Sequence, residues 1–366
     1  MWLKELRQML FSRIRLQKPK RKDPRRRQRW VHLSIDPLED RTLPSVFVPT
    51  IFTDSNAPGT GSLRDAVIAA NQDPGKGSDT ISLAAGTYTL SIPDSAGGQE
   101  NGAITGDLDI TNTAHKLIIQ GQGTSGSNAT IINQTVLDRV FQVFGAQVVF
   151  QNLVIQGGQA VDDGSAGALP GSSNALGGGI LNSNGMVTLN TVVIQSNQAK
   201  ASNGSNGLGG GIYSVGGSLV ISGSSISNNR ALGGSGTPGS PGVAGTSASP
   251  DGGSGGAGSN GGDAQGGGLF IRGGTLSISG SSVSGNSALG GTGGDGGSGG
   301  AGFRGINGAN GGAGGSGGNA AAGGNAQGGG LYAIQLTLTL TQDNFATNQA
   351  QGWRRRRRRL RGSRRG

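Results

Sequence analysis

The amino-acid sequence predicts an all-β protein, a right-handed parallel β-helix (solenoid) with an N-terminal capping helix and Gly-rich corner inserts. Three observations predict this fold: four stretches of 23 residues align without a gap, their apolar residues alternate as in strands, and glycine accounts for 75 of the 366 residues. A repeat of this length is typical of a solenoid, in which each unit buries its apolar face on the next. The stretches begin at Gly177, Gly209, Gly266 and Gly328.

Equivalent positions in the four stretches carry the same kind of side chain. Counting the first glycine as zero, apolar residues recur at +3, +10, +12 and +17, asparagine at +20 and alanine at +22. Apolar residues two apart indicate strands, whereas an amphipathic helix needs a period of about 3.6. We expect three short strands and three turns per unit, with asparagines that hydrogen-bond turn backbone and their copies in the next unit. Three columns are Ile180, Ile212, Leu269, Leu331 at +3; Ile194, Ile226, Val283, Phe345 at +17; and Asn197, Asn229, Asn286, Asn348 at +20.

The same frame extends upstream of the four stretches. Starting from Asp138, the offsets reach Phe141, Val148, Phe150, Ile155, Gly158 and Ala160, which predicts a fifth unit with glycine in place of asparagine. Looser units precede it at Leu117/Ile119, Leu108/Ile110 and Ile81/Leu83. The glycine triplet of each unit suits a corner that needs positive φ or a close approach of two backbones.

One helix is expected in the folded part, over residues 62–72. Ser62 and Asp65 form a capping-box pattern, and the apolar residues that follow fall on one helix face. Because the end of a solenoid exposes apolar surface and strand edges, a short amphipathic helix there indicates a cap.

The chain divides into four segments. We expect a basic leader and sorting segment at 1–47, the cap and first β-helix rungs at 48–137, regular coils at 138–350, and an Arg-rich tail at 351–366 that is unfolded or a frameshift product. A slip of one base turns GGC glycine codons into CGG arginine codons, which motivates the frameshift hypothesis. It predicts that the natural protein continues with further coils.

Gly-rich inserts separate the coils at one corner, at 200–208, 232–265 and 289–327. Their composition cannot bury enough apolar surface to fold independently, so flexible loops are expected. They do not keep a strict Gly-x-y period, which excludes collagen. Residues 290–295 match half of a calcium-binding β-roll repeat, but Gly297 occupies its aliphatic position and no second copy follows.

The charge is divided unevenly along the chain. Residues 1–31 hold 12 of the 30 Lys and Arg residues and 352–366 hold 9, which leaves 9 basic against 18 acidic residues between them, a net charge of −9. The basic run at 18–29 has the residues for phosphate contacts. It contains no aromatic residue for base stacking, and an acidic body repels a duplex, so we expect no specific nucleic-acid partner.

The sequence has no cysteine, so disulfides and thiolate metal sites are excluded. No apolar run reaches transmembrane length, and the first 50 residues lack the apolar core of a signal peptide.

Two segments and the repeats resemble known families. Residues 38–47, LEDRTLPSVF, resemble the N-terminal sorting motif of exported planctomycete proteins, and residues 52–90 are similar to the head of the CSLREA-type β-helix family, with Gly61 at its Cys position. The GGG[IL]…N-x-A units are similar to repeats of chlamydial-type polymorphic outer-membrane proteins, whose aromatic position is kept only by Phe345. These resemblances imply an exported, envelope-associated β-helix protein, often adhesin-like.

An enzyme on this fold would need clustered acids. Glycosidases use two carboxylates roughly 5–9.5 Å apart. The candidate pairs are Asp107/Asp109, which flank the inward Leu108 and are expected to point outward into solvent, and Asp162/Asp163, which open a Gly-rich loop. His32 lies in the leader and His115 is expected in a turn, and the two histidines have no matching acid cluster.

The sequence therefore predicts a non-catalytic scaffold or adhesin at the cell surface, outer membrane-associated or extracellular, with no catalytic, cofactor or metal residues. The expected partners are a cell-envelope polymer, a polysaccharide or another cell surface. Two alternatives stay open: a polysaccharide lyase or hydrolase that uses Asp107 and Asp109, and a nucleic-acid or polyanion binder that acts through its Arg-rich tails.

Overall fold

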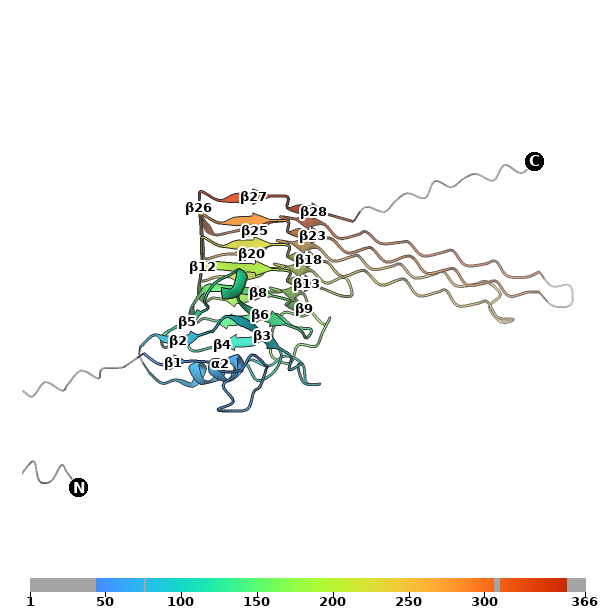
Figure 1. Ribbon diagram of the computed structural model, residues 1–366. Coiled ribbons are helices and arrows are strands. Elements are labelled where there is room, and N and C mark those ends of the chain that lie inside the picture. Colours follow the sequence, from blue (N-terminus) through green and yellow to red (C-terminus); the bar gives the residue numbers. More distant parts are fainter. Residues whose placement is uncertain (1–43, 76, 306–309, 354–366) are drawn as a thin grey trace, which may run out of the picture. The chain divides into compact units, whose positions relative to one another are not determined.

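The computed structural model describes residues 44–75, 77–305 and 310–353 (Figure 1). Most of the predicted leader and tail therefore lies outside the described residues. The described part is all-β, with parallel strand pairs, one α-helix and one short 3-10 helix. None of its helices has the length and apolar character needed to cross a membrane.

The strands form four sheets. The largest has 13 strands, and their bounds are β1 Val46–Phe47, β2 Asp79–Ser82, β3 Gly86–Leu90, β5 Lys116–Gln120, β6 Thr130–Gln134, β8 Gln147–Gln156, β12 Met186–Gln195, β16 Ser218–Ser222, β17 Ser225–Ser227, β21 Thr275–Ser279, β22 Ser282–Ser284, β26 Thr337–Thr341 and β27 Asn344–Ala346. A second sheet contains β4 Leu108–Ile110, β7 Phe141–Phe144, β11 Ile180–Ser183, β15 Ile212–Val215, β20 Leu269–Arg272 and β25 Leu331–Ile334.

Two smaller sheets complete the arrangement. One contains β9 Gln159–Ala160, β13 Gln198–Lys200, β18 Arg230–Leu232, β23 Ser287–Leu289 and β28 Gln349–Gln351. The other contains β10 Ala175–Leu176, β14 Gly207–Leu208, β19 Ala264–Gln265 and β24 Ala326–Gln327.

Strand pairing follows the predicted columns residue by residue. In the second sheet Ile180 pairs with Ile212, Ile212 with Leu269, and Leu269 with Leu331. The upstream frame is also confirmed, because Phe141 pairs with Ile180. The apolar columns are buried as far as Val283, but in the last unit Leu338, Leu340 and Phe345 are 44%, 46% and 40% exposed because only one neighbouring unit covers them.

The asparagine column forms the predicted hydrogen-bond ladder. Asn229 Nδ2 donates to Ile194 O at 2.9 Å and to Asn286 Oδ1 at 3.0 Å. Asn229 Oδ1 in turn accepts from Asn197 N at 3.0 Å and from Asn197 Nδ2 at 3.1 Å. Each buried amide thus joins backbone of one unit to the amide of the next.

The glycine triplet has both properties expected from the sequence, a positive φ and a close approach of two backbones. Gly209 has φ +65°, and a Cβ on Gly210 would lie 2.4 Å from the backbone oxygens of Arg230 and Gly267. Side chains at these two positions are therefore excluded, one by conformation and the other by the backbones of the adjacent segments.

The predicted helix is confirmed as α2, Leu63–Gln72. Ser62 is its N-cap and its Oγ accepts from Asp65 N at 3.0 Å. The Asp65 carboxylate does not return to Ser62 N. It accepts from Gly59 N and Gly61 N instead, at 3.1 and 3.0 Å. Leu63, Ala66 and Val67 are buried in the same apolar core as the columns.

The inserts 232–265 and 289–327 are not the flexible loops that their composition predicts. Their extended segments lie side by side (Figure 1) and are joined by backbone hydrogen bonds at every third residue. Gly236, Gly239, Gly242 and Gly245 donate to Thr292, Asp295, Ser298 and Ala301 at 2.7–2.8 Å. A Gly-x-y period therefore does exist locally, from Gly233 to Gly245.

Because of this period, the inserts can be held together by backbone hydrogen bonds instead of by buried apolar side chains, which was the criterion used in the sequence analysis. Three residues per turn without internal hydrogen bonds is typical of polyproline II chains, whose free amides can bond neighbouring chains. A Cβ on Gly258 would lie 2.3 Å from Gly294 O, so only glycine permits the spacing. We call residues 233–262, 290–305 and 310–324 the glycine bundle.

Candidate functional site

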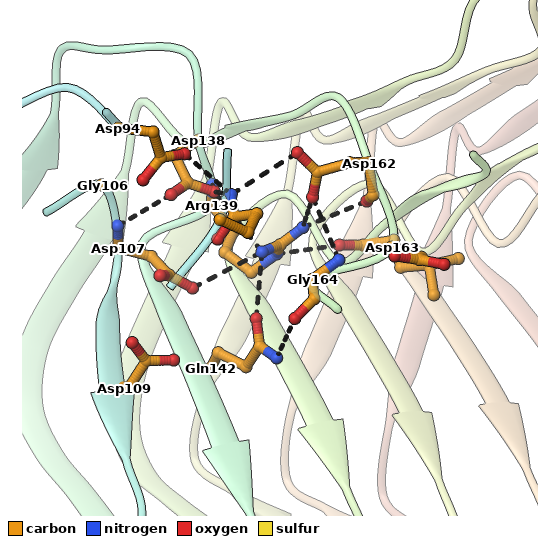
Figure 2. Close-up of polar contacts among 12 residues, drawn as sticks. Asp94, Gly106, Asp107, Asp109, Asp138, Arg139, Gln142, Asp162, Asp163 and Gly164 are labelled. Atoms are coloured by element: carbon orange, nitrogen blue, oxygen red, sulfur yellow. Dashed lines mark hydrogen bonds and ion pairs between the residues drawn. The ribbon is translucent and has the colours of Figure 1, made fainter. Parts of the chain in front are cut away.

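Members of both predicted aspartate pairs meet in one buried cluster around Arg139 (Figure 2). Arg139 Nη2 lies 2.7 Å from Asp162 Oδ1, while Nη1 lies 3.4 Å from Asp138 Oδ1 and 3.6 Å from Asp107 Oδ2. Nη1 also donates to Gln142 Oε1 at 3.0 Å. Arg139 itself is 0% exposed, so neighbouring carboxylates of the protein, and not solvent, must balance its charge.

The predicted solvent exposure of Asp107 and Asp109 is wrong. Their residues are 1% and 0% exposed. They do leave the core side of β4, opposite Leu108, but other parts of the chain cover that outer face. Arg139 lies over Asp107, and Ala103 N donates to Asp109 Oδ2 at 2.9 Å.

Asp162 and Asp163 lie in different environments at the start of their loop. Asp162 is buried and accepts from Gly164 N at 3.0 Å as well as pairing with Arg139. Asp163 Oδ1 accepts from Ser165 N at 3.1 Å within the loop. Only the first of the pair therefore contributes a carboxylate to the cluster.

Gln99 links a further carboxylate to this cluster. Its Nε2 donates to Asp138 Oδ1 at 2.8 Å and to Asp94 Oδ2 at 3.1 Å. Asp94 is half-buried and lines a surface pocket of about 400 Å³, whereas Asp138 is 1% exposed. The sequence analysis did not identify Asp94, Asp138 or Arg139 as members of a site. Asp138 and Arg139 are the first two residues of the fifth unit's frame, where the later units carry glycine, and Asp94 lies in a separate segment.

Five carboxylates thus lie around the Arg139 guanidinium, and the pKa values of Asp107, Asp109 and Asp138 are raised. Burial, followed by the charges of Asp138 and Asp109, raises the pKa of Asp107 well above its usual value. Burial raises the pKa of Asp109 to about 8 and that of Asp138 to about 6, the latter against the opposing charge of Arg139. Burial also opposes the charge of Arg139, but the neighbouring carboxylates outweigh it and raise its pKa.

The geometry of the oxygens agrees with protonated carboxyls. Both carboxylate oxygens of Asp107 and Oδ1 of Asp109 are buried without a hydrogen-bond partner among the described residues. The 3.6 Å contact from Arg139 to Asp107 is too long for a hydrogen bond. An unpaired buried carboxylate is costly, so the neutral acid is favoured.

The cluster offers little to an external substrate. Its members other than Asp94 are 1% exposed or less, so a polymer cannot reach them. Over the described ranges, no group of three or more His, Cys, Asp or Glu side chains has an arrangement that would hold a metal ion. The cluster is thus a buried network of carboxyl groups around one guanidinium.

His115 has one acidic partner, which the sequence analysis did not identify. Its Nε2 lies 2.6 Å from Asp79 Oδ2, and the two side chains are 4% and 2% exposed. This pair joins the turn before β5 to β2. His32 lies outside the described residues.

A groove of about 440 Å³ crosses the largest sheet where its strands bend. β12 passes through the bend unbroken, while the following units divide there into β16 and β17, β21 and β22, and β26 and β27. The lining residues are Thr124, Thr191, Val192, Val193, Gly223, Ser224, Ser225, Gly280, Ser281, Ser282, Gln342 and Asn344. The sequence analysis did not find this groove. The only pattern pointing to it is the polar pair at +15 and +16 of the last three units, Ser224/Ser225, Ser281/Ser282 and Asp343/Asn344, where the first unit has Val192/Val193.

Comparison of the chain with protein-family models, with curated proteins and with solved structures finds no match.

Proposed function

We propose that this chain is a right-handed parallel β-helix that serves as a non-catalytic, exported scaffold or adhesin at the cell surface. The observation that carries the proposal is the regular stacking of parallel strands from which the glycine bundle extends. Such a stack repeats equivalent outward positions from unit to unit, which suits contact with an extended polymer.

Export rests on the resemblance of residues 38–47 to a sorting motif. The proposed partners are a cell-envelope polymer, a polysaccharide or another cell surface. The burial of Asp107 and Asp109 supports a non-catalytic role, since these were the acids on which a lyase or hydrolase would depend.

The proposal is tested with the purified full chain and a panel of neutral and acidic polysaccharides, in calcium and separately in EDTA. Both retention of the protein and release of reducing or unsaturated ends are measured. We expect retention without product. Product formation that EDTA abolishes would replace the scaffold with a polysaccharide lyase, and absence of retention on every polymer would contradict the proposal.

A shortened chain separates the glycine bundle from the strand stack. Gly262 N donates to Gly234 O at 2.8 Å, so residues 235–261 can be replaced by a short turn. Gly324 N donates to Gly291 O at 2.8 Å, so residues 292–323 can be replaced likewise. If the shortened chain folds and still binds, the strand stack is the binding surface.

A further inference from the structure

We propose that the groove at the strand bend binds an extended, uncharged polysaccharide that runs across the strands. This inference rests on the proposed function and names the ligand class and the surface that binds it.

The groove presents a row of unsatisfied polar side chains. Ser225 pairs in register with Ser282, and Ser282 with Asn344. Strands in a sheet are about 4.8 Å apart, so these side chains repeat at that interval. Within the described part of the chain their side-chain polar atoms form no hydrogen bond, and all three are at least partly exposed. Donors and acceptors repeated in a line match a polymer rather than a compact ligand.

The floor of the groove is held in place beneath this row. Ser281 Oγ donates to Ser279 O at 2.9 Å and accepts from Ser224 N at 3.1 Å. Ser224 Oγ makes the same contacts one unit earlier, to Ser222 O at 2.8 Å and from Val192 N at 3.0 Å. The row of free side chains therefore stands on a rigid base.

At the bend, two units have a residue with a side chain at a positive-φ position where glycine would be less strained. Gly223 and Gly280 have φ +53° and +55° at this position. In the flanking units Thr191 and Gln342 adopt φ +54° and +57°. A β-branched residue is rarely found at positive φ. Both side chains line the groove, and neither forms a hydrogen bond within the described ranges, so their polar groups are available to a ligand.

Charge selects the class of polymer. The lining residues are all uncharged. Asp343 lies beside the groove, with Oδ1 accepting from Ser281 N and Oδ2 from Thr341 N, both at 2.9 Å. A polyanion would meet this carboxylate without a neighbouring lysine or arginine in the lining, so a neutral glycan is favoured. Because no aromatic ring lines the groove for sugar stacking, affinity has to come from many weak contacts and should rise with chain length.

The test compares two serines of one strand in the full chain. Ser282 lines the groove, whereas Ser284 points to the same side of β22 without lining it. S282R and S284R therefore add the same side chain to the same strand. Melting by circular dichroism verifies that both variants are folded.

Binding is measured by affinity electrophoresis in dextran, galactomannan and hydroxyethyl cellulose, with alginate and polygalacturonate as acidic probes. We expect the wild type and S284R to bind a neutral polymer, and S282R to lose at least roughly tenfold in affinity. Shorter oligosaccharides of the same glycan should bind progressively less tightly.

Two results would overturn the inference while leaving the proposed function standing: equal binding by S282R and the wild type, or binding of acidic polymers in preference to neutral ones. Failure of the wild type to bind any polymer would remove the proposed function as well.

Discussion

Asn197 and Asn229 are joined by two hydrogen bonds across adjacent units, since Asn229 Oδ1 accepts from both the backbone N and the Nδ2 of Asn197 at 3.0 and 3.1 Å. Both residues are 1% exposed or less. The side chain of one unit thus satisfies the turn backbone of its neighbour, and stacking order is coupled to hydrogen bonding at this corner.

Asn229→Ala should destabilise the fold by about 3 kcal/mol, because it leaves Asn197 N and Ile194 O buried without partners. Urea unfolding followed by circular dichroism measures the change. Ser227→Ala in the neighbouring strand is the matched control, since the Ser227 side chain has no hydrogen bond among the described residues. A loss below about 0.5 kcal/mol for Asn229→Ala would show that the ladder contributes little.

Arg139→Gln should cost about 4 kcal/mol, because it removes the guanidinium that pairs with Asp138 and Asp162 and leaves these buried carboxylates uncompensated. The free energy of unfolding at pH 7 reports the loss. Arg230→Gln, at an exposed position of β18, should be close to neutral. Equal effects of the two substitutions would contradict the role given to Arg139.

The stability of the protein should depend on pH through Asp109. Its pKa is raised on folding to about 8, so the folded state holds a proton that the unfolded state has released. The contribution is therefore fully present below the unfolded pKa of about 4 and is lost as pH rises to about 8, by up to roughly 1.4 kcal/mol per pH unit.

Asp109→Asn should remove this contribution, so the difference in unfolding free energy between variant and wild type should increase in favour of the variant from pH 5 to pH 8. Ser227→Ala, which removes no titratable group, should give a difference that does not vary in this way. A pH-independent difference for Asp109→Asn would mean that the carboxyl is not protonated in the folded state.

Gly297→Ala should disrupt the glycine bundle, because a Cβ there would lie 2.0 Å from Ser240 O. Gly317→Ala is a matched substitution in the same bundle, where the nearest atom, Gly297 O, lies 3.6 Å from the added Cβ. Hydrogen exchange of the amides of Gly239 and Gly242 should accelerate at least roughly tenfold in Gly297→Ala and remain unchanged in Gly317→Ala. Equal exchange rates in both variants would indicate that the bundle tolerates side chains at its packed positions.

The parallel pairing could be predicted from residue patterns, because each strand repeats the register of the preceding one. Once Ile180 is aligned with Ile212 and Asn197 with Asn229, the apolar columns and the buried amide ladder follow. The helix at 63–72 could be found for a similar reason, since its Ser62 cap and apolar face are local in sequence.

The buried cluster and the glycine bundle were decided only by tertiary structure. Asp107 and Asp109 alternate with Leu108 as solvent-facing strand residues do, but Ala103 and Arg139, from other segments, contact them in the buried cluster. These contacts come from separate segments and obey no period. In the inserts, the stabilising contacts are backbone hydrogen bonds between segments such as 233–245 and 290–301, which composition cannot reveal because every residue carries the same backbone groups.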